Sequence, residues 1–518
     1  MKTSIPSFVA TIGSPREPAL LEMAGQLSPH ARGGKGCAFG VLQVGFNAGA
    51  VGDSFEEHIK DFGEHVIVWS GELLNRRELA YLLMARKPSL AQASDIELIH
   101  ELVVRLGLEA LQLVEGRFAL LLWDKRREKV VAARDALGLM PLMFCSIAGG
   151  VAFTTEVKAF RSGAVGPLVL KPLAAFDSSA ELPDDFSMFE NVHKVAPGGW
   201  VEFSVTGVRT GGGRYFRIAR PGSLAGSVEA VSASLKHLLE QSLDECTQGL
   251  GESGTLGVSL SGGLDSSVVA SLAVRRRSGT RTFSVGTELA NEFPEARVAA
   301  RFAGSEHSEH EAPASSIPHG IVNAIFYNEL FDALSAEIAA PLYLLYRSIE
   351  GRADLLLTGY GADLLFAGVC PPEVGPDQAN EYLFGLVSRT LWTGEFSPFL
   401  ASRFGLLVRN PYWNSRLMAF ALSVPGQMKL QGKEVKKVLR DLAFREGWLP
   451  HEVAYRTKIG VHEGSGANAI FARYLGLSNV RDYRAKDRFV YAAFRELFIG
   501  NREVEELDLE RLRKEACG

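Results

Sequence analysis

The sequence of 518 residues has no long uninterrupted apolar run. A helix that spans a membrane needs about 20 consecutive apolar residues, and the strongest candidate, LLLTGYGADLLFAGV, carries Asp363 in its middle. The first residues, MKTSIPSFVATIGSPREP, also lack the sustained apolar core of a signal peptide. We therefore expect a cytoplasmic protein that does not contact a membrane.

Cysteine is scarce, and neither sign of charge dominates. The cysteines are odd in number, widely scattered and free of CxxC pairs, which argues against a disulfide framework or a zinc site. The 55 basic and 60 acidic residues leave a formal charge of −5, so no excess of positive charge points to nucleic acid. The cysteines are therefore expected to be small buried or incidental residues: Cys37, Cys145, Cys246, Cys370 and Cys517.

The two halves of the chain have different patterns. Residues 1–215 contain short apolar or alternating runs separated by Gly, Asp and Asn, which predicts a mostly antiparallel sheet, with a helix near residues 94–107. Residues 206–227, TGVRTGGGRYFRIARPGSLAGS, have little periodicity and are the best linker candidate. We place the domain boundary between residues 215 and 216.

Strand and helix patterns alternate from residue 227 to about residue 305. The predicted order is a helix over 227–246, a strand over 255–260, a helix over 266–277, a strand over 281–287 and a helix over 295–305. Such alternation is typical of a doubly wound parallel sheet. Beyond residue 315 the pattern is mainly helical.

The stretch SLSGGLDSS, residues 259–267, directly follows the apolar run TLGV, residues 255–258, of the first of these two predicted strands. It is not a Walker loop, because no GxxxxGK[ST] occurs in the chain. A strand that ends in Ser-Gly-Gly and leads into a helix near Asp265 would gather backbone N–H groups around one concavity, which suits a phosphate. Asp265 fits there if it holds a divalent cation that bridges the phosphates. The alternative is an ordinary glycine-containing turn.

This stretch resembles the pyrophosphate loop of the ATP pyrophosphatase family, whose enzymes form acyl adenylates. The segment LLLTGYGADLLFAGV resembles the asparagine synthetase stretch SGEGADELFGGY in spacing and glycines. The resemblance implies that Asp265 and Asp363 hold Mg²⁺. It also implies that ATP is bound by Leu260, Ser261, Gly262, Gly263, Asp265, Ser266, Ser267, Val285, Gly286, Thr358 and Gly359.

The first half resembles the glutaminase domain of asparagine synthetase in the order of SGELLNRRELAYLL, VVAARDALGLMPLMF and FTTEVKAF. Asn75 and Asp95 then stand where that family binds glutamine. Glutaminase chemistry of this kind needs a cysteine directly after the initiator Met, with a free amine as its base, whereas this chain begins Met1-Lys2-Thr3. Cys37 cannot replace it, because an internal residue has no free amine. We therefore expect residues 1–215 to be a catalytically silent domain.

Departures from asparagine synthetase indicate a branch of the family. Tyr360 replaces the Glu of GEGAD, and YRTKIGVHEGSG retains Lys458 but differs in the residues after it. Both changes resemble the β-lactam synthetases, and FSVGTELANEF, YNELFDALSAEI and RTLWTGEF look more like carbapenam synthetase than like the clavulanic-acid enzyme. The resemblance implies a catalytic dyad of Tyr360 and Glu395, with Lys458 as the catalytic cation. Taken singly, each could instead be an ordinary packed or solvated residue.

Two other polar patterns give weaker indications of function. His307 and His310 in EHSEHE look like metal ligands, but they lack the helical HExxH frame and a partner cluster, so we do not expect a metal there. His462 and Glu463 are assigned only a hypothetical role in ordering the loop that carries Lys458.

The expected protein thus has two domains. Residues 1–215 are an Ntn-hydrolase-like, glutaminase-like β-sandwich with helices, and residues 216–518 are a doubly wound parallel sheet of the ATP pyrophosphatase type with added helices. The expected reaction uses ATP and Mg²⁺ to cyclise a carboxymethylproline-like amino acid to a carbapenam. The alternatives are a β-lactam synthetase for a carboxyethyl-arginine type of substrate, an ammonia-dependent asparagine synthetase, a lasso-peptide cyclase, and a scaffold without activity. We also expect a homo-oligomer.

Overall fold

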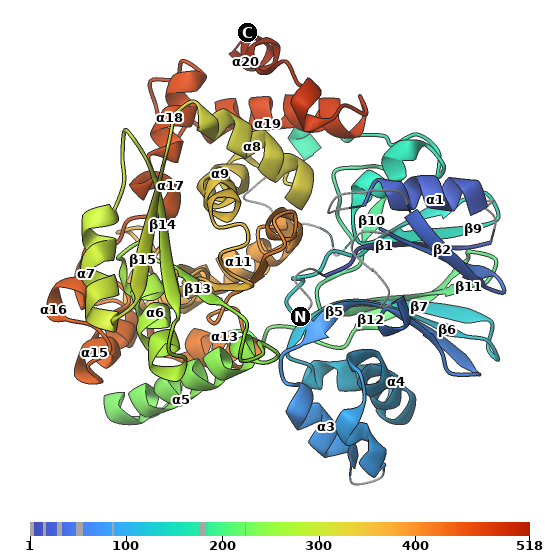
Figure 1. Cartoon of the computed structure of the whole chain (residues 1–518), viewed down its shortest axis with the longest axis horizontal. Helices are drawn as coiled ribbons and strands as arrows, with labels where there is room; N and C mark the ends of the chain where they lie inside the picture. The colour runs from blue at the N-terminus through green and yellow to red at the C-terminus, as the bar shows by residue number, and fades with distance from the viewer. Residues whose placement is uncertain are drawn as a thin grey trace.

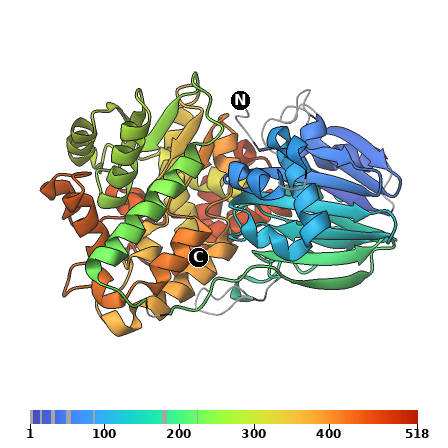
Figure 2. The same ribbon diagram turned by 90° about the horizontal axis from the view of Figure 1, so that it is seen from below.

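The computed structural model describes residues 5–13, 17–27, 34–47, 55–84, 87–175, 183, 185–222 and 224–517. The chain forms two bodies that lie side by side, one built from antiparallel sheets and one built around a parallel sheet (Figure 1). The perpendicular view separates the same two bodies (Figure 2). The predicted fold class, α+β followed by α/β, is confirmed.

The N-terminal body is a sandwich of two six-stranded antiparallel sheets. One sheet has the strand order β10-β8-β9-β1-β3-β2, and the other has the order β12-β11-β7-β6-β5-β4. The strands in chain order are β1 (Phe8–Ile12), β2 (Gly34–Phe39), β3 (Leu42–Asn47), β4 (Ile59–Asp61), β5 (His65–Leu73), β6 (Gly116–Asp124), β7 (Lys129–Arg134), β8 (Met143–Ile147), β9 (Gly150–Thr154), β10 (His193–Lys194), β11 (Gly199–Ser204) and β12 (Arg209–Arg214).

Apolar side chains on both faces explain why β5 and β6 read as nearly continuous apolar runs. Alternate residues such as Val66 and Val68 point into the core between the sheets, while Ile67 and Trp69 pack against helices on the outer face. Those helices are α3 (Arg76–Met84) and α4 (Asp95–Leu106), and α1 (Glu17–Gly25) contacts the other sheet. Helix α4 begins at a capping box in which Ser94 and Glu97 bond each other's backbone, which confirms the helix predicted there.

The predicted linker is only partly a linker. Residues 209–214 form β12, which pairs with β11 at the edge of its sheet, so the glycine-rich run TGGGR belongs to a hairpin. Gly211 and Gly213 lie against the ring of Trp200, at about the distance of van der Waals contact for an added Cβ atom. The connection between the bodies is therefore the shorter stretch after β12.

The C-terminal body contains a five-stranded sheet in the order β15-β14-β13-β16-β17, with every neighbouring pair parallel. Its strands are β13 (Leu256–Ser259), β14 (Arg281–Thr287), β15 (Glu306–Ala312), β16 (Leu355–Leu357) and β17 (Leu407–Arg409). Helices α6 (Leu264–Arg276) and α7 (Phe293–Ala303) pack against β13 and β14. Helix α9 (Ala333–Ser348) also contacts β14, from the side that α8 (Ser316–Asn328) occupies (Figure 1). Helices thus cover both faces, as predicted for a doubly wound sheet.

The helices of this body agree with the pattern expected after residue 227. They are α5 (Val228–Thr247), α6 (Leu264–Arg276), α7 (Phe293–Ala303), α8 (Ser316–Asn328), α9 (Ala333–Ser348), α10 (Ala362–Leu365), α11 (Pro376–Thr393), α12 (Phe399–Ser402), α13 (Ser415–Ser423), α14 (Gly426–Lys429), α15 (Lys437–Arg445), α16 (His451–Ala454), α17 (Val461–Gly464), α18 (Ala467–Tyr474), α19 (Tyr483–Phe498) and α20 (Leu509–Cys517). Within the described ranges, none of these helices is both long and apolar enough to cross a membrane.

Candidate active site

A cavity of about 420 Å³ lies at the carboxyl ends of β13 and β16. From β13 the chain proceeds to β14 and β15 on one side, and β16 and β17 lie on the other side. Open α/β sheets bind ligands at such a switch point, because the loops after the two central strands diverge there. The loops after β13 and β16 both line this cavity.

The loop after β13 is folded tightly on itself. The Ser261 N–H donates to Ser266 Oγ at 3.1 Å, and the Gly263 N–H donates to Ser261 Oγ at 3.3 Å. Gly262 has φ +73°, and a Cβ atom there would lie 2.4 Å from the backbone nitrogen of Ala296. The residue must therefore be glycine for α7 to pack at this distance. Helix α6 begins at Leu264, so its free N–H groups face the cavity end of β13.

The second loop lies directly against the first. A Cβ atom at Gly359 would lie 2.5 Å from the backbone nitrogen of Ser266, so glycine is required for this contact. Thr358 Oγ1 donates to Asn410 Oδ1 at 2.6 Å and accepts from the Tyr360 N–H at 3.1 Å. These bonds tie the loop after β16 to the segment after β17.

Asp265 and Asp363 converge, as predicted, from two segments that lie far apart in the sequence. Both contact the buried Lys436, whose Nζ lies 2.6 Å from Asp363 Oδ1 and forms a short ion pair with Asp265. Asp265 Oδ1 is buried and accepts no hydrogen bond from any described residue. Two carboxylates with a free oxygen suit Mg²⁺, which takes its other ligands from water and substrate phosphates.

The electrostatics of this pair are unequal. Burial raises the pKa of Asp265, and the nearby Lys436 only partly offsets this. At Asp363 burial acts in the same direction, but Lys436 and Lys458 outweigh it and hold the pKa below its ordinary value. Asp363 therefore carries the firmer negative charge in the protein without ligand.

Tyr360 and Glu395 form the predicted dyad. The Tyr360 hydroxyl donates to Glu395 Oε2, and Ser335 Oγ donates to the other carboxylate oxygen at 2.6 Å. Ser335 in turn donates its N–H to Asp332 Oδ1 at 2.8 Å at the start of α9. The four residues thus form one chain of hydrogen bonds in the cavity wall.

Burial is the main influence on both members of the dyad. Burial, and then the charge of Glu395, raises the pKa of Tyr360 well above its ordinary value. Burial, and then the neighbouring Asp332, raises the pKa of Glu395, against the hydrogen bonds from Ser335 and Tyr360. Glu395 is therefore a stronger base than a solvated glutamate.

Lys458 lies in the loop before α17, with its Nζ 3.5 Å from Asp363 Oδ2. Arg456, two residues earlier, pairs with Glu292 at 2.8 Å and so ties this loop to the start of α7. Glu463 accepts a hydrogen bond from the Gly460 N–H at 3.2 Å, as expected of a residue that orders the loop. His462 lines the cavity, and burial lowers its pKa to about 4, so the imidazole is neutral at physiological pH.

The predicted site residues divide into two groups. Those that line the cavity are Ser261, Gly263, Asp265, Ser266, Thr358, Gly359, Tyr360, Asp363, Glu395 and Lys458. Leu260, Gly262, Ser267, Val285 and Gly286 are not part of its described lining. The Leu260 N–H, for example, donates to the Phe283 carbonyl at 2.8 Å and so holds β14. Contact of the second group with a nucleotide stays a prediction.

Four residues of the site escaped the sequence analysis: Lys436, Asp332, Ser335 and Arg389. Lys436 lies in the charged run KEVKKVLRD, which reads like a solvated helix face. Lys436 has φ +61°, an uncommon backbone conformation for a residue with a side chain. Such conformations are concentrated at functional sites. Asp332 could have been noticed as an N-cap before an apolar run.

The side chains of Asn75 and Asp95 make contacts within the N-terminal body. The Asn75 amide donates to the Leu113 carbonyl at 2.9 Å and accepts from the Glu115 N–H at 3.0 Å. Asp95 accepts from the Leu73 N–H at 3.2 Å and pairs with Arg76. Both side chains are thus engaged in structural contacts where glutamine binding was the family role.

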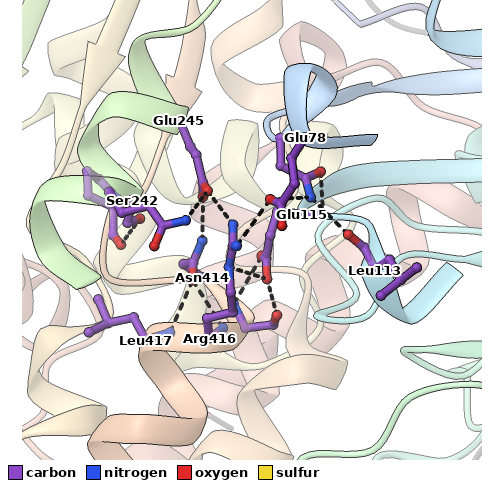
Figure 3. A network of polar contacts seen from close by, with 12 residues as sticks. Glu78, Leu113, Glu115, Ser242, Glu245, Asn414, Arg416 and Leu417 are labelled. Atoms are coloured by element: carbon purple, nitrogen blue, oxygen red, sulfur yellow. Dashed lines mark hydrogen bonds and ion pairs between the residues drawn. The ribbon is translucent and has the colours of Figure 1, made fainter. Parts of the chain in front are cut away.

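A polar network around Arg416 joins the two bodies (Figure 3). Arg416, in α13, lies among three carboxylates, 3.2 Å from Glu78 Oε2, 3.6 Å from Glu115 Oε1 and in a short ion pair with Glu245. Glu78 and Glu115 belong to the N-terminal body, and Glu245 belongs to α5. Asn414 completes the network by donating to Glu245 at 3.0 Å.

The remaining candidates lie elsewhere. Cys37 is half-buried in β2, where burial raises the pKa of its thiol to about 12, which disfavours a nucleophilic thiolate. Residues Met1–Thr3 lie outside the described residues. His307, in β15, contacts Thr282 and Ser284 through its two ring nitrogens. Among the described residues no group of three or more His, Cys, Asp or Glu side chains could hold a metal ion.

Comparisons with known proteins agree with the division into two bodies. The family model described as asparagine synthase matches residues 234–374 and 399–506, and the glutamine amidotransferase domain model matches residues 58–216. Carboxyethyl-arginine beta-lactam-synthase of Streptomyces clavuligerus is 32% identical over 452 residues, which cover 86% of this chain and 83% of that enzyme.

A glutamine-hydrolyzing asparagine synthetase of Oryza sativa subsp. japonica is 27% identical over 424 residues, which cover 77% of this chain and 66% of that enzyme. Among solved structures, glutamine phosphoribosylpyrophosphate amidotransferase from B. subtilis matches with a TM-score of 0.30 and 13% identity, covering 59% of this chain and 81% of that one. Both the family models and the Streptomyces relative place this chain in the asparagine synthase family.

Proposed function

We propose that this protein is an ATP- and Mg²⁺-dependent ligase that closes a β-lactam ring within a single amino-acid substrate. The observation that carries the proposal is the buried Tyr360–Glu395 pair, which lines the same cavity as the Ser261–Ser266 loop. The Ser261–Ser266 loop suits a nucleoside triphosphate, and the Tyr360–Glu395 pair suits removal of a proton from an amine. Family membership and the beta-lactam-synthase relative support the same chemistry.

The first step is activation of a substrate carboxylate. A carboxylate oxygen attacks the α-phosphorus of ATP, a P–O bond to the β-phosphate breaks, and pyrophosphate leaves. The free N–H groups at the start of α6 and the hydroxyl groups of Ser261 and Ser266 bind and orient the phosphates. Asp265 and Asp363 would hold Mg²⁺, which neutralises charge on the phosphates when it is bound.

The second step forms the amide. The substrate amine attacks the acyl carbon, the C–N bond forms, and the C–O bond to AMP breaks. An aliphatic amine with a pKa near ~10 is protonated at neutral pH and must lose that proton. The Tyr360 hydroxyl passes its proton to Glu395 and takes the proton of the amine, which the raised pKa of Glu395 favours.

Lys458 stabilises the negative charge that grows on the acyl oxygen and on the departing phosphate. Its Nζ lies beside Asp363, and the residue lines the same cavity as the phosphate loop and Tyr360. A fixed ammonium group in a partly dry cavity is worth more than the same group in water. Because both reacting groups belong to one substrate, holding it in a folded pose supplies much of the remaining rate.

The proposed substrate is a carboxymethylproline-like amino acid, and the product is a carbapenam. This choice rests on the stretches FSVGTELANEF, YNELFDALSAEI and RTLWTGEF. The second candidate is ring closure of a carboxyethyl-arginine type of substrate, which the 32% identity to the Streptomyces enzyme favours. The N-terminal domain is proposed to make no ammonia. The homo-oligomer stays a prediction, which light scattering would test.

The test is mass spectrometry of three incubations with ATP and Mg²⁺ in which AMP is also followed. The substrates are carboxymethylproline, carboxyethyl-arginine, and aspartate with ammonia. Loss of one water from carboxymethylproline, with one AMP for each product, is the expected result. Conversion of aspartate alone would identify an ammonia-dependent asparagine synthetase. Absence of AMP in all three incubations would remove the proposal.

A further inference from the structure

The part of the cavity beyond the dyad lies between α9 and α11 and has a mainly apolar wall. Arg389, near the carboxyl end of α11, is half-buried in this wall. Within the described ranges its guanidinium has no hydrogen bond and no carboxylate at ion-pair distance, and the carboxylates of Asp332, Glu395 and Asp487 lie near enough for its charge to lower their pKa values. The apolar residues in the cavity lining include Leu334, Ile338, Leu342, Val369, Leu386 and Phe396.

The carboxylate oxygens of the same cavity either have a hydrogen-bond or ion-pair partner or are buried. Glu395 accepts hydrogen bonds from Tyr360 and Ser335. Asp332 accepts the Ser335 N–H at 2.8 Å, and its other oxygen is buried and has no hydrogen-bond partner among the described residues. Asp265 and Asp363, the other two acids of the described lining, face Lys436 at the phosphate end.

These charges favour one kind of substrate. A positively charged side chain would find no carboxylate oxygen between α9 and α11 that is both exposed and unpartnered, and it would meet the like charge of Arg389. A carboxylate would find a guanidinium that it can bind through two parallel hydrogen bonds. Removing such an ion from water inside an apolar wall also requires a partner of opposite charge.

We infer that Arg389 binds a second, unreacting carboxylate of the substrate. The substrate class is then an amino acid with two carboxylates on a compact, uncharged frame, one carboxylate at the phosphate loop and the other at Arg389. This inference rests on the proposed function, because it assumes that the first carboxylate is the one that reacts. It assigns Arg389 as the residue that selects against a substrate with a cationic side chain.

The experiment measures binding, so it does not depend on turnover. Calorimetry is done on the full chain with Mg²⁺ and a non-hydrolysable ATP analogue, and the ligands are carboxymethylproline, its ring carboxamide and carboxyethyl-arginine. The proteins are the wild type, Arg389→Met, Arg389→Lys and the control Glu381→Gln, which changes an exposed residue of the same helix.

The wild type is expected to bind the dicarboxylate at least ~10-fold more tightly than the carboxamide, the order of one charge-assisted contact. Arg389→Met removes this preference, Arg389→Lys retains part of it, and Glu381→Gln leaves it unchanged. Affinity for the ATP analogue stays the same in all four proteins. The comparison of dicarboxylate with carboxamide in the wild type needs no variant to fold.

Three results would overturn the inference: equal affinity of the wild type for dicarboxylate and carboxamide, tighter binding of carboxyethyl-arginine, or an undiminished preference in Arg389→Met. Binding of none of the ligands would overturn it as well. If the dicarboxylate binds through Arg389 but yields no lactam, the proposed function fails while the inference stands. If lactam forms and Arg389→Met binds the dicarboxylate as tightly as the wild type does, the inference fails while the proposed function stands.

Discussion

Arg117, in β6 of the amidotransferase domain, donates from Nη1 to the backbone carbonyl of Val408 in β17 of the synthase sheet, at 3.0 Å. Both residues line the candidate active site. Glu72 faces Arg117 across the β5–β6 ladder and binds both Arg117, at 3.0 Å, and Arg409, at 2.7 Å. The N-terminal domain therefore forms part of the wall of the synthase cavity.

Arg117→Met is expected to raise the KM for ATP about 10-fold, with a smaller effect on kcat. Loss of the guanidinium frees β17, whose Arg409 carbonyl accepts the Thr358 N–H at 3.2 Å and so positions the loop after β16. An effect of this size corresponds to about 1.4 kcal/mol, the scale of one buried charge-assisted bond. ATP–pyrophosphate exchange measures it.

Arg161→Met is the matched control for that variant. Arg161 is also a buried arginine of the N-terminal domain, and it donates to the Arg502 carbonyl at 3.0 Å, on a segment that does not line the cavity. It is expected to lower the melting temperature without changing the KM for ATP. Equal changes of KM in the two variants would show that general loosening of the domain contact, and not the position of Arg117, is responsible.

Two variants next to the dyad are expected to move its pH profile in opposite directions. The hydrogen bond from Ser335 lowers the pKa of Glu395, so Ser335→Ala raises that pKa and moves the acid limb of kcat/KM to higher pH. The charge of Asp332 raises the pKa of Glu395, so Asp332→Asn moves the same limb to lower pH. Shifts of the same sign in both variants would mean that Glu395 is not the titrating base.

Tyr360→Phe is expected to slow amide closure about 100-fold or more, the usual range for a general base, while adenylate formation changes little. The phenol hydrogen-bonds Glu395 and has no contact with the phosphate loop residues in the hydrogen bonds of the described chain. Rapid-quench kinetics that resolve adenylate from lactam measure the two steps. Equal slowing of both would remove the dyad from the mechanism.

Lys436→Met is expected to make stability depend on Mg²⁺. The ammonium group of Lys436 separates Asp265 from Asp363, and without it two buried carboxylates repel each other. The metal-free variant should melt at a lower temperature than the wild type, and Mg²⁺ should recover more of the loss in the variant than it adds to the wild type. An unchanged response to Mg²⁺ would mean that these carboxylates do not hold the ion.

The parts of the site that were predictable from sequence are those in which neighbouring residues act together. The stretch SLSGGLDSS predicts the end of a strand, a loop and the start of a helix. Gly262 and Gly359 are required by close backbone contacts. Lys436 and Arg389 carry no such local signal, because their importance comes from contacts with segments that only the fold brings near. The structural role of Asn75 could not be predicted for the same reason, because its side chain bonds the Leu113 carbonyl and the Glu115 N–H, which are distant in the sequence.

The predicted linker was only partly correct, for a related reason. Glycine-rich sequence without periodicity usually indicates a loop, but here the run forms β12, which pairs with β11 and lies against the Trp200 ring. A glycine-rich edge strand lacks the alternation of apolar and polar side chains by which strands are recognised. The contact with Trp200 is visible only once β11 and β12 are paired.

The network around Arg416 gives stability its own pH dependence. Burial raises the pKa of Glu245 to about 7, with the nearby Glu115 and Glu78 adding to the effect and Arg416 opposing it. Between its ordinary value of 4.5 and about 7, the folded protein binds a proton at Glu245 that the unfolded chain does not. Stability from this group is therefore full below pH 4.5 and is lost as pH rises through about 7.

Glu245→Gln is expected to flatten this dependence, because the amide does not titrate. The difference in melting temperature between variant and wild type should therefore shift in favour of the variant as pH rises from about 5 to about 8, the range that brackets the raised pKa. Differential scanning calorimetry over that range measures it, and taking the difference cancels the titration of groups outside the network. A difference that stays constant with pH would show that Glu245 is charged throughout, with Arg416 compensating its burial in full.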